Sequence, residues 1–458
     1  MAAQPSPLPV CADGVMKDTL DAQTRARTLA GSALVNLLVA GTLCTLAVDN
    51  AQLIADSCAR LMGSADFAAG FEPFTLVAVV SLITLLVALL ALLEHATLFL
   101  ELRETLRAEA RAWNCGGKSF YEGAQWVALR RGRHVAVVTR NIPCFSQTTP
   151  CFFFVHGSMA RLGQFGAIIK RVEKLGCGCF SFDMFGMGRS AGRYMPIDDG
   201  SDAYSTSSFS RDELLLDLIA AYACCCEQSG GPVIIVAHSF GCQLAIELAL
   251  NIADPLCLDM PKARDPAGMV LLGCQGPVDG GDADLAKYAK AKRLFGLPLF
   301  VLRLIRPFLS RGFKERAFHT DTVAVLEGIN SELNSGTCTP TPERSRYLRN
   351  MLEYAAALSG SNSMAVCKAF YTQTLGTGIS TARLKRHRGM LPFVHLVTGA
   401  SDQIASPKSL APIIEALGAE YTEIPLAGHQ CMEEQPDAVF DVLCEMAFKV
   451  SGKKIVSK

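Results

Sequence analysis

Ser239 lies at the junction of an apolar run and a helix-forming run. The run from Val233 to Ala237 is continuously apolar and predicts a buried strand, and QLAIELALNI, shortly after the serine, predicts a helix. The small residues Ala237 and Gly241 flank the serine, because a sharp turn leaves no room for larger side chains. Such a corner exposes a hydroxyl and places a helix N-terminus beside it, which favours a developing negative charge. Ser239, preceded by His238, is therefore the candidate nucleophile for acyl transfer.

The string AHSFG around this serine resembles the G-x-S-x-G nucleophile elbow of the α/β-hydrolase family, with Ala237 in place of the first glycine. The resemblance covers residues 121–448 and is closest to monoacylglycerol lipases and α/β-hydrolase-domain lipases. It implies a mostly parallel eight-stranded sheet flanked by helices, with a helical cap, and it assigns Ala237, His238 and Gly241 to the elbow. A serine at the elbow argues against members that hydrolyse epoxides or haloalkanes, which place an aspartate there.

The segment CFFFVHGSM, residues 151–159, resembles the strand and His-Gly pair that build the oxyanion loop of this family. The resemblance implies that the backbone N–H groups of Ser158 and Phe240 stabilise the oxyanion of the tetrahedral intermediate. It assigns His156 and Gly157 to the support of the loop. DMFGMGRS, residues 183–190, resembles a structural turn of the family and carries no assigned chemistry.

A serine hydroxyl needs a base, and the base needs an acid that orients it. In the resembling family the order along the chain is nucleophile, acid, base, each after a later strand. LPFVHLVTGASDQI matches the acid-bearing segment and gives Asp402, and TEIPLAGH matches the final strand and gives His429. The implied Ser-His-Asp mechanism uses no cofactor. The cysteine runs at 177–179 and 224–226 lack the spacing and histidine partners of a zinc site, so no metal is assigned.

Short apolar runs alternate with helical patterns after residue 119. Several of them are continuously apolar, which is typical of strands buried on both faces. This βαβ pattern predicts an α/β fold with a mostly parallel sheet and active groups at the carboxyl ends of its strands. The expected strands are Ala124–Leu129, His134–Thr139, Cys151–His156, Cys179–Asp183, Val233–His238, Met269–Gly273, Phe393–Thr398 and Glu420–Ile424.

An insertion at 276–388 divides the predicted core into residues 119–275 and 389–450. In the resembling family this interval carries the cap or lid. Here the stretch Lys287 to Arg316 holds nine basic residues and one acidic residue, around the apolar run LFGLPLFVLRLI. At 12 residues, this run is too short to span a bilayer. Two interpretations remain open, namely an interfacial lid with cations for anionic headgroups and an amphipathic cap helix packed on the core.

Two uncharged apolar runs precede the core, at 28–48 and 73–93. Each has 21 residues, which as a helix spans about 31 Å, the thickness of the hydrocarbon core of a bilayer. They predict a transmembrane hairpin between an N-terminal tail, 1–27, and a connecting helix or linker, 94–118. A signal sequence or a buried helix is the alternative for the first run. Residues 451–458 form the C-terminal tail.

The charges that flank the two runs predict an orientation. Three basic residues precede the first run closely and three follow the second, whereas the loop 49–72 holds a single arginine. By the positive-inside bias, the loop lies outside the cytosol, and the hydrolase domain lies in the cytosol. The 18 cysteines, several of them in apparent core elements, fit a reducing compartment better than a disulfide framework. The membrane itself is left open, the endoplasmic reticulum being one candidate.

Composition excludes two classes of protein. The 43 Lys+Arg and 43 Asp+Glu give no net charge, unlike the basic excess of a nucleic-acid binder, and 50% hydrophobic residues exclude a disordered chain. The sequence predicts a two-pass, membrane-anchored serine hydrolase that acts on lipid esters such as mono- or diacylglycerol or lysophospholipid. The partners are the hydrophobic ester substrate and the membrane, and no protein partner is assigned. One alternative is a thioesterase or acyltransferase with the same triad. Another is a non-catalytic membrane-tethered scaffold, although the intact triad argues against it.

Overall fold

The structure is a computed structural model of the chain, and it describes most of the predicted hydrolase region. The described residues are 82, 85–100, 123–129, 133–142, 148–190, 206–253, 263–276, 282–335 and 364–452. They belong to two compact units. The larger unit holds the described residues of 105–297 and 305–458, and the smaller unit holds those of 19–104 together with 298–304.

An eight-stranded sheet forms the centre of the larger unit, in the order β1-β2-β4-β3-β5-β6-β7-β8. β2 is antiparallel to both of its neighbours, and all other neighbouring strands are parallel. Each strand expected from the sequence is present, with ends that differ by at most one residue. The strands are β1 Gln125–Ala128, β2 His134–Arg140, β3 Cys151–Val155, β4 Gly178–Phe182, β5 Val233–His238, β6 Gly268–Leu272, β7 Phe393–Gly399 and β8 Glu420–Ile424.

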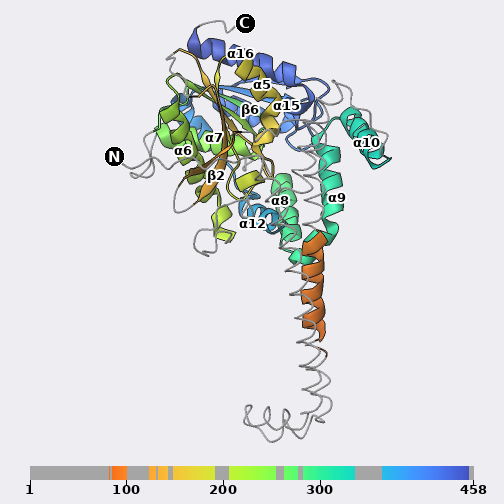
Figure 1. The fold of residues 1–458 in the computed structure, drawn as a ribbon. Coiled ribbons are helices and arrows are strands. Elements are labelled where there is room, and N and C mark those ends of the chain that lie inside the picture. The colour runs from red at the N-terminus through yellow and green to blue at the C-terminus, as the bar shows by residue number, and fades with distance from the viewer. Residues whose placement is uncertain are drawn as a thin grey trace, which may run out of the picture. The chain divides into compact units, whose positions relative to one another are not determined.

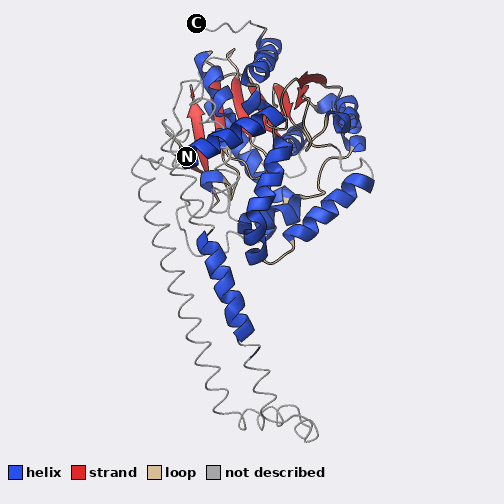
Figure 2. Ribbon diagram, turned by 90° about the vertical axis from the view of Figure 1, so that its right-hand side faces the viewer, coloured by secondary structure: helices blue, strands red, loops and turns tan. Residues whose placement is uncertain are grey.

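Separate apolar clusters cover the two faces of the sheet, as alternating side chains along each strand require. Phe153 and Ile235 belong to one cluster, and Phe152 and Ile234, one position earlier, belong to the other. Both faces carry helices (Figures 1 and 2). The first cluster includes residues of α6 (Arg211–Gln228), α7 (Phe240–Ala253) and α14 (Pro407–Leu417), and the second includes residues of α5 (Gly166–Lys174) and α16 (Pro436–Ser451).

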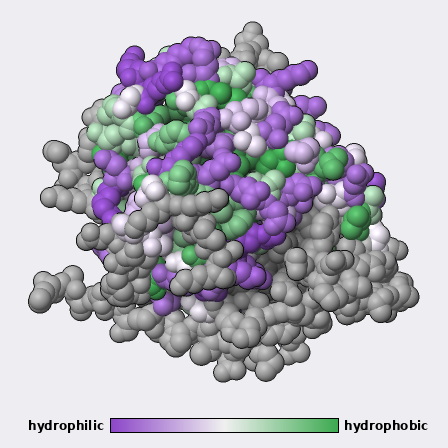
Figure 3. Space-filling model, turned by 90° about the horizontal axis from the view of Figure 1, so that it is seen from above, coloured by the Kyte–Doolittle hydropathy of each residue, from purple (hydrophilic) through white to green (hydrophobic). Residues whose placement is uncertain are grey.

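Helix α16 is amphipathic. Val439 and Leu443, four residues apart, are fully buried against the sheet, whereas Asp437 and Asp441 on the opposite side are exposed. Figure 3, which looks down on this end of the molecule, shows hydrophilic and hydrophobic side chains interspersed. The burial pattern of this helix therefore follows its sequence directly.

The interval predicted as the cap is helical where the structure describes it. The apolar run at 294–305 is not one helix: α8 ends at Phe295 and α9 begins at Leu299. Gly296 closes the first helix, its N–H donating to the carbonyl of Lys292 at 2.9 Å, and Pro298 has no N–H to continue the ladder. The remaining helices described are α8 Asp282–Phe295, α9 Leu299–Ala317, α10 Thr320–Ser335, α12 Met364–Thr374, α13 Thr381–His387 and α15 Cys431–Glu434, with 3₁₀ turns at Leu162–Phe165, Gly188–Ser190, Thr206–Phe209 and Arg388–Met390.

The smaller unit contains a helix at 85–100 and the first turns of α9. Arg303 donates to the carboxylate of Glu94, and its guanidinium is almost fully buried. Among the described residues, no helix has both the length and the apolarity needed to cross a membrane. The predicted span 28–48 lies outside the described residues, and of 73–93 only residues 82 and 85–93 are described.

Candidate active site

The residues predicted for the site come together at one edge of the sheet. Ser158 follows β3, Ser239 follows β5, Asp402 follows β7 and His429 follows β8. These four strands are parallel, so their carboxyl ends meet at the same edge, where open α/β sheets place their ligands. Segments almost two hundred residues apart in the sequence are thereby brought into contact.

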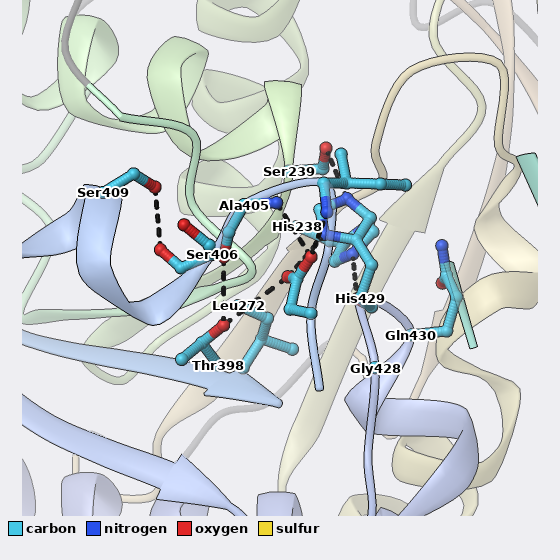
Figure 4. A network of polar contacts seen from close by, with 12 residues as sticks. His238, Ser239, Leu272, Thr398, Ala405, Ser406, Ser409, Gly428, His429 and Gln430 are labelled. Carbon is cyan, nitrogen blue, oxygen red and sulfur yellow. Dashed lines mark hydrogen bonds and ion pairs between the residues drawn. The ribbon is translucent and has the colours of Figure 1, made fainter. Parts of the chain in front are cut away.

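A continuous hydrogen-bonded chain joins three of these side chains. His429 Nε2 lies 2.9 Å from Ser239 Oγ, and His429 Nδ1 lies 2.8 Å from Asp402 Oδ2. Oδ1 of the aspartate accepts from the N–H groups of Ile404 and Ala405, each at 2.8 Å (Figure 4). The carboxylate makes Nδ1 the protonated nitrogen of the imidazole and leaves Nε2 to accept the serine proton. All three side chains are buried.

Ser239 has the backbone geometry of a strained corner. Its φ is +52°, a region that residues other than glycine rarely adopt, and α7 begins at the next residue. A Cβ at Gly241 would lie 2.6 Å from the carbonyl oxygen of His156 and 2.8 Å from that of Val155. The elbow therefore packs backbone to backbone on the end of β3, and only glycine fits at this position.

The loop after β3 lies directly against Ser239. A Cβ at Gly157 would lie 2.7 Å from Nδ1 of His238 and 3.1 Å from Cβ of Ser239. Ser158 lines the same cavity as Ser239, and Phe240 is the first residue of α7. The backbone N–H groups of Ser158 and Phe240 are therefore the candidate donors to an oxyanion formed at Ser239.

His156 holds this loop through both ring nitrogens. Its Nε2 accepts from the N–H of Met184 at 2.9 Å, so its Nδ1 carries the proton and donates to the carbonyl of Gly157 at 2.8 Å. The ring is fully buried, and burial lowers its pKa to about 4. His156 is thus a neutral ring whose two hydrogen bonds tie the loop after β3 to the loop after β4, the supporting position that the family resemblance implies.

A buried network behind the site includes two glutamines that the sequence did not single out. Gln164 Oε1 accepts from the N–H of Gly157 at 3.2 Å, and its Nε2 donates to His238 Nδ1 at 3.1 Å and to Gln430 Oε1 at 2.7 Å. His238 Nε2 donates in turn to the carbonyl oxygen of His429 at 2.9 Å. The network connects the loop after β3 to the backbone of His429, and no local motif marks either glutamine.

Glu434 is a second residue that the sequence did not single out. Its carboxylate accepts from the N–H of Gly428 at 2.6 Å and from the N–H of His319, just before α10, at 2.8 Å. The N–H of Gln430 donates to the carbonyl of Ala317, the last residue of α9, at 3.1 Å. Burial raises the pKa of Glu434. The loop that carries His429 is therefore bonded to the junction of α9 and α10.

A cavity of about 310 Å³ opens onto Ser239 and His429. Residues of α8, α9 and α12 form the wall opposite the sheet, and most of that wall is apolar. A concave, largely apolar site with a few polar groups is the usual form of a small-molecule pocket. The apolar lining includes Leu294, Phe295, Leu309, Phe313, Met364 and Leu375.

Cysteines and other possible metal ligands also occur outside the triad in the described residues. In the part of the chain that the structure describes, no group of three or more His, Cys, Asp or Glu side chains has the arrangement of a metal site. Cys151 and Cys225 lie with their sulfurs 3.8 Å apart in the core, and burial raises the pKa of Cys225 well above its ordinary value. Such thiols pack as small apolar side chains.

All of the residues placed at the site lie in one stretch that a family model matches. The model, described as the alpha/beta hydrolase family, matches residues 152–442. The chain belongs to the alpha/beta hydrolase family. This hydrolase has the eight-stranded, mostly parallel sheet and the strand-end site that the sequence resemblance implied. The comparison with curated proteins gave no match.

The solved structures to which this hydrolase is similar are distant in sequence. A thermophilic esterase from Thermogutta terrifontis is 14% identical, with 72% of this chain and 100% of that chain covered and a TM-score of 0.49. A membrane phospholipase A, described as a bacterial virulence factor, is 15% identical over 82% of this chain and 99% of that one, with a TM-score of 0.48. A bromoperoxidase from Bacillus anthracis is 13% identical over 71% and 97%, with a TM-score of 0.47. Likenesses at this level carry no argument about substrate.

Proposed function

We propose that this alpha/beta hydrolase is a serine hydrolase that cleaves carboxylic esters. The observation that carries the proposal is the hydrogen-bonded chain Asp402–His429–Ser239, with distances of 2.8 and 2.9 Å, at the floor of an apolar cavity. A serine hydroxyl paired with an imidazole that a buried carboxylate orients is the arrangement that activates serine as a nucleophile.

In the proposed first half-reaction, Ser239 Oγ attacks the ester carbonyl while its proton passes to Nε2 of His429. Asp402 stabilises the imidazolium through Nδ1, and the oxyanion accepts from the N–H groups of Phe240 and Ser158. The tetrahedral intermediate then collapses: the bond between the carbonyl carbon and the leaving oxygen breaks, and His429 gives its proton to the departing alcohol. The product on the enzyme is an acyl ester of Ser239.

In the second half-reaction a water molecule replaces the alcohol. His429 takes a proton from the water as its oxygen attacks the acyl carbon, and the same N–H groups stabilise the second oxyanion. Collapse breaks the bond to Oγ, and the proton on His429 returns to Ser239 as the carboxylic acid leaves. The cycle regenerates the free enzyme, and every proton that moves is held by a residue of this chain.

The apolar wall supports lipid esters as the substrate class. Phe295, Leu309 and Phe313 lie on cap helices α8 and α9 and face the same cavity as Ser239. Burial of an acyl chain against such side chains is favourable by about 0.8 kcal/mol per methylene group. Mono- and diacylglycerols and lysophospholipids are therefore the proposed esters.

We further propose that residues 28–48 and 73–93 anchor the enzyme in a membrane as a two-pass protein with the hydrolase domain in the cytosol. The described part of the second segment supports this proposal. In the helix at 85–100, Leu85 is 60% exposed and Val87 is 59% exposed. A row of exposed large apolar side chains marks a surface that another apolar medium covers.

The first test is labelling of the full chain with a fluorophosphonate probe. Wild type should be labelled and should hydrolyse lipid esters, and Ser239→Ala should abolish labelling and lower hydrolysis at least about 10⁴-fold. Ser409→Ala is the matched control, because the Ser409 hydroxyl donates to the carbonyl of Ser406 at the start of α14 and lies outside the triad. Labelling and turnover in the folded Ser239→Ala variant near the wild-type level would contradict the proposal.

A further inference from the structure

One face of helix α9 contributes charge as well as apolar surface to the cavity. Arg306, Leu309, Phe313 and Arg316 recur at three- and four-residue steps, so they share the face that lines the cavity above Ser239. Ten residues separate the two arginines, which places them about 15 Å apart along the helix. The basic stretch noted in the sequence thus contributes two of its cations to the wall of the site.

The charged side chains among the described residues that line the cavity are basic. Among the described residues that line it, none is an aspartate or a glutamate, whereas Arg306 and Arg316 both contribute to the wall. A cleft with low-dielectric walls and charges of one sign concentrates ligands of the opposite sign. An uncharged acylglycerol would gain nothing from this potential.

Arg316 lies at the end of α9 that approaches the triad. The next residue, Ala317, accepts from the N–H of Gln430, which follows His429 directly. Nε of Arg316 donates to the carbonyl of Gly312 in its own helix at 2.9 Å, which uses one of the five N–H groups of the guanidinium. Its side chain is exposed to solvent at the mouth of the cavity. An anionic group bound there would sit in water while the acyl chain enters the apolar interior.

We propose that the substrate carries a phosphate group, that Arg316 binds this phosphate, and that Arg306 adds to the positive potential of the cavity. A guanidinium presents paired N–H donors that match two phosphate oxygens. The inference rests on the proposed acyl-enzyme mechanism at Ser239 and narrows its substrate to phosphorylated acyl compounds, either oxygen esters or thioesters. A glycerophosphate headgroup and coenzyme A are the two sources of such a phosphate on an acyl group.

The test measures protection of Ser239 from fluorophosphonate labelling by ligands that cannot be hydrolysed. The full chain in a neutral detergent is labelled in the presence of 1-O-hexadecylglycerol, 1-O-hexadecylglycerol 3-phosphate or S-hexadecyl-coenzyme A. The first two differ only in the phosphate. In wild type, the concentration of the phosphorylated ether that gives half-protection should be at least about tenfold lower than that of hexadecylglycerol. A hydrogen bond to a charged group contributes a factor of this size.

Three variants assign the effect to residues. Arg316→Gln should remove the preference for the phosphorylated ether and leave protection by hexadecylglycerol unchanged, and Arg306→Gln should weaken the preference less. Arg311→Gln is the matched control, because Arg311 lies on the same helix, is largely exposed, pairs with Glu315 at 2.9 Å and does not line the cavity. It should keep the wild-type preference.

The outcomes separate this inference from the proposed function. Equal protection by the two ethers in wild type, or an undiminished preference in Arg316→Gln, overturns the inference while labelling of Ser239 still supports the hydrolase. A wild-type chain that is not labelled overturns the proposed function and the inference with it. Stronger protection by S-hexadecyl-coenzyme A than by the phosphorylated ether, lost in Arg316→Gln, supports the inference and names coenzyme A as the source of the phosphate.

Discussion

Three histidines meet near Ser239, and each has different hydrogen-bond partners. His156 bonds two backbone groups, and His238 bonds the side chain of Gln164 and the carbonyl of His429. Of the three, His429 is the ring held between a carboxylate and a hydroxyl. Burial lowers the pKa of both His156 and His238, so these rings are neutral supports at neutral pH.

The low pKa of His156 predicts a loss of stability in mild acid. Its ordinary pKa is 6.5 and its pKa in the folded protein is about 4, so between these values the unfolded chain binds a proton that the folded protein does not. The stabilising effect is complete above pH 6.5 and is lost as the pH falls toward 4, by up to about 1.4 kcal/mol per pH unit. His156→Gln, whose amide can serve the same two backbone groups, should show a shallower fall in the free energy of unfolding.

Chemical denaturation of both proteins at several pH values between 4 and 7 measures this difference. An NMR titration of the His156 ring in wild type provides the direct check, with the ring staying neutral at pH 5. Identical slopes for wild type and His156→Gln, or a ring that titrates near pH 6.5, would contradict the assignment.

Residues with chemical motifs could be predicted, and residues that act through distant contacts could not. Ser239, Asp402 and His429 each follow a strand within a recognisable string, and the structure brings them into hydrogen-bond contact. Gln164 and Gln430 bond each other across 266 positions of sequence. No sequence pattern predicts that two distant glutamines will bond each other, so this network is seen only in the folded structure.

At the scale of elements, the close approach of the elbow to strand β3 depends on glycine. Gly241→Ala would place a methyl group 2.6 Å from the carbonyl oxygen of His156, and neither backbone segment can move without disturbing the sheet. We expect a loss of about 1–3 kcal/mol in the free energy of unfolding. Denaturation in detergent, followed by circular dichroism, measures it.

Gly312→Ala is the matched control for this substitution. Gly312 lies within helix α9, and a Cβ there would have no atom within 4 Å, so alanine adds helix propensity without a clash. This variant should be more stable than wild type by about 0.5–1 kcal/mol. A Gly241→Ala protein as stable as wild type would show that the elbow is not in backbone contact with β3.

Strands were predictable from sequence to within one residue, whereas the cap was not. Continuous apolar runs such as Val233–His238 have one stable position, buried between two layers of helices. The apolar run at 294–305 has no such constraint, and it divides at Gly296 into the end of α8 and the start of α9. Hydropathy alone does not locate this break, because Gly296 and Pro298 interrupt the helix without interrupting the apolar run.

At the scale of the whole molecule, the proposed orientation makes a prediction about glycosylation. Asn-x-Ser/Thr acceptor sites engineered into the loop 49–72 should be modified in cells, because this loop is proposed to lie outside the cytosol. A site engineered at an exposed loop of the hydrolase domain should stay unmodified. Gel mobility before and after deglycosylation measures both, and modification of the hydrolase-domain site would invert the proposed topology.

The hydrogen bonds between the His429 loop and the α9–α10 junction limit which caps from other proteins could replace the cap of this enzyme. The N–H of Gly428 donates to Glu434, and the N–H of Gln430 donates to the carbonyl of Ala317. Glu434 also accepts from the N–H of His319. A cap grafted from another member of the family would have to supply a carbonyl and an N–H at the same two points, or the histidine would lose its support. The cap and the loop that carries His429 therefore depend on each other. We expect substrate range to change by substitution within the cap more readily than by exchange of the whole cap.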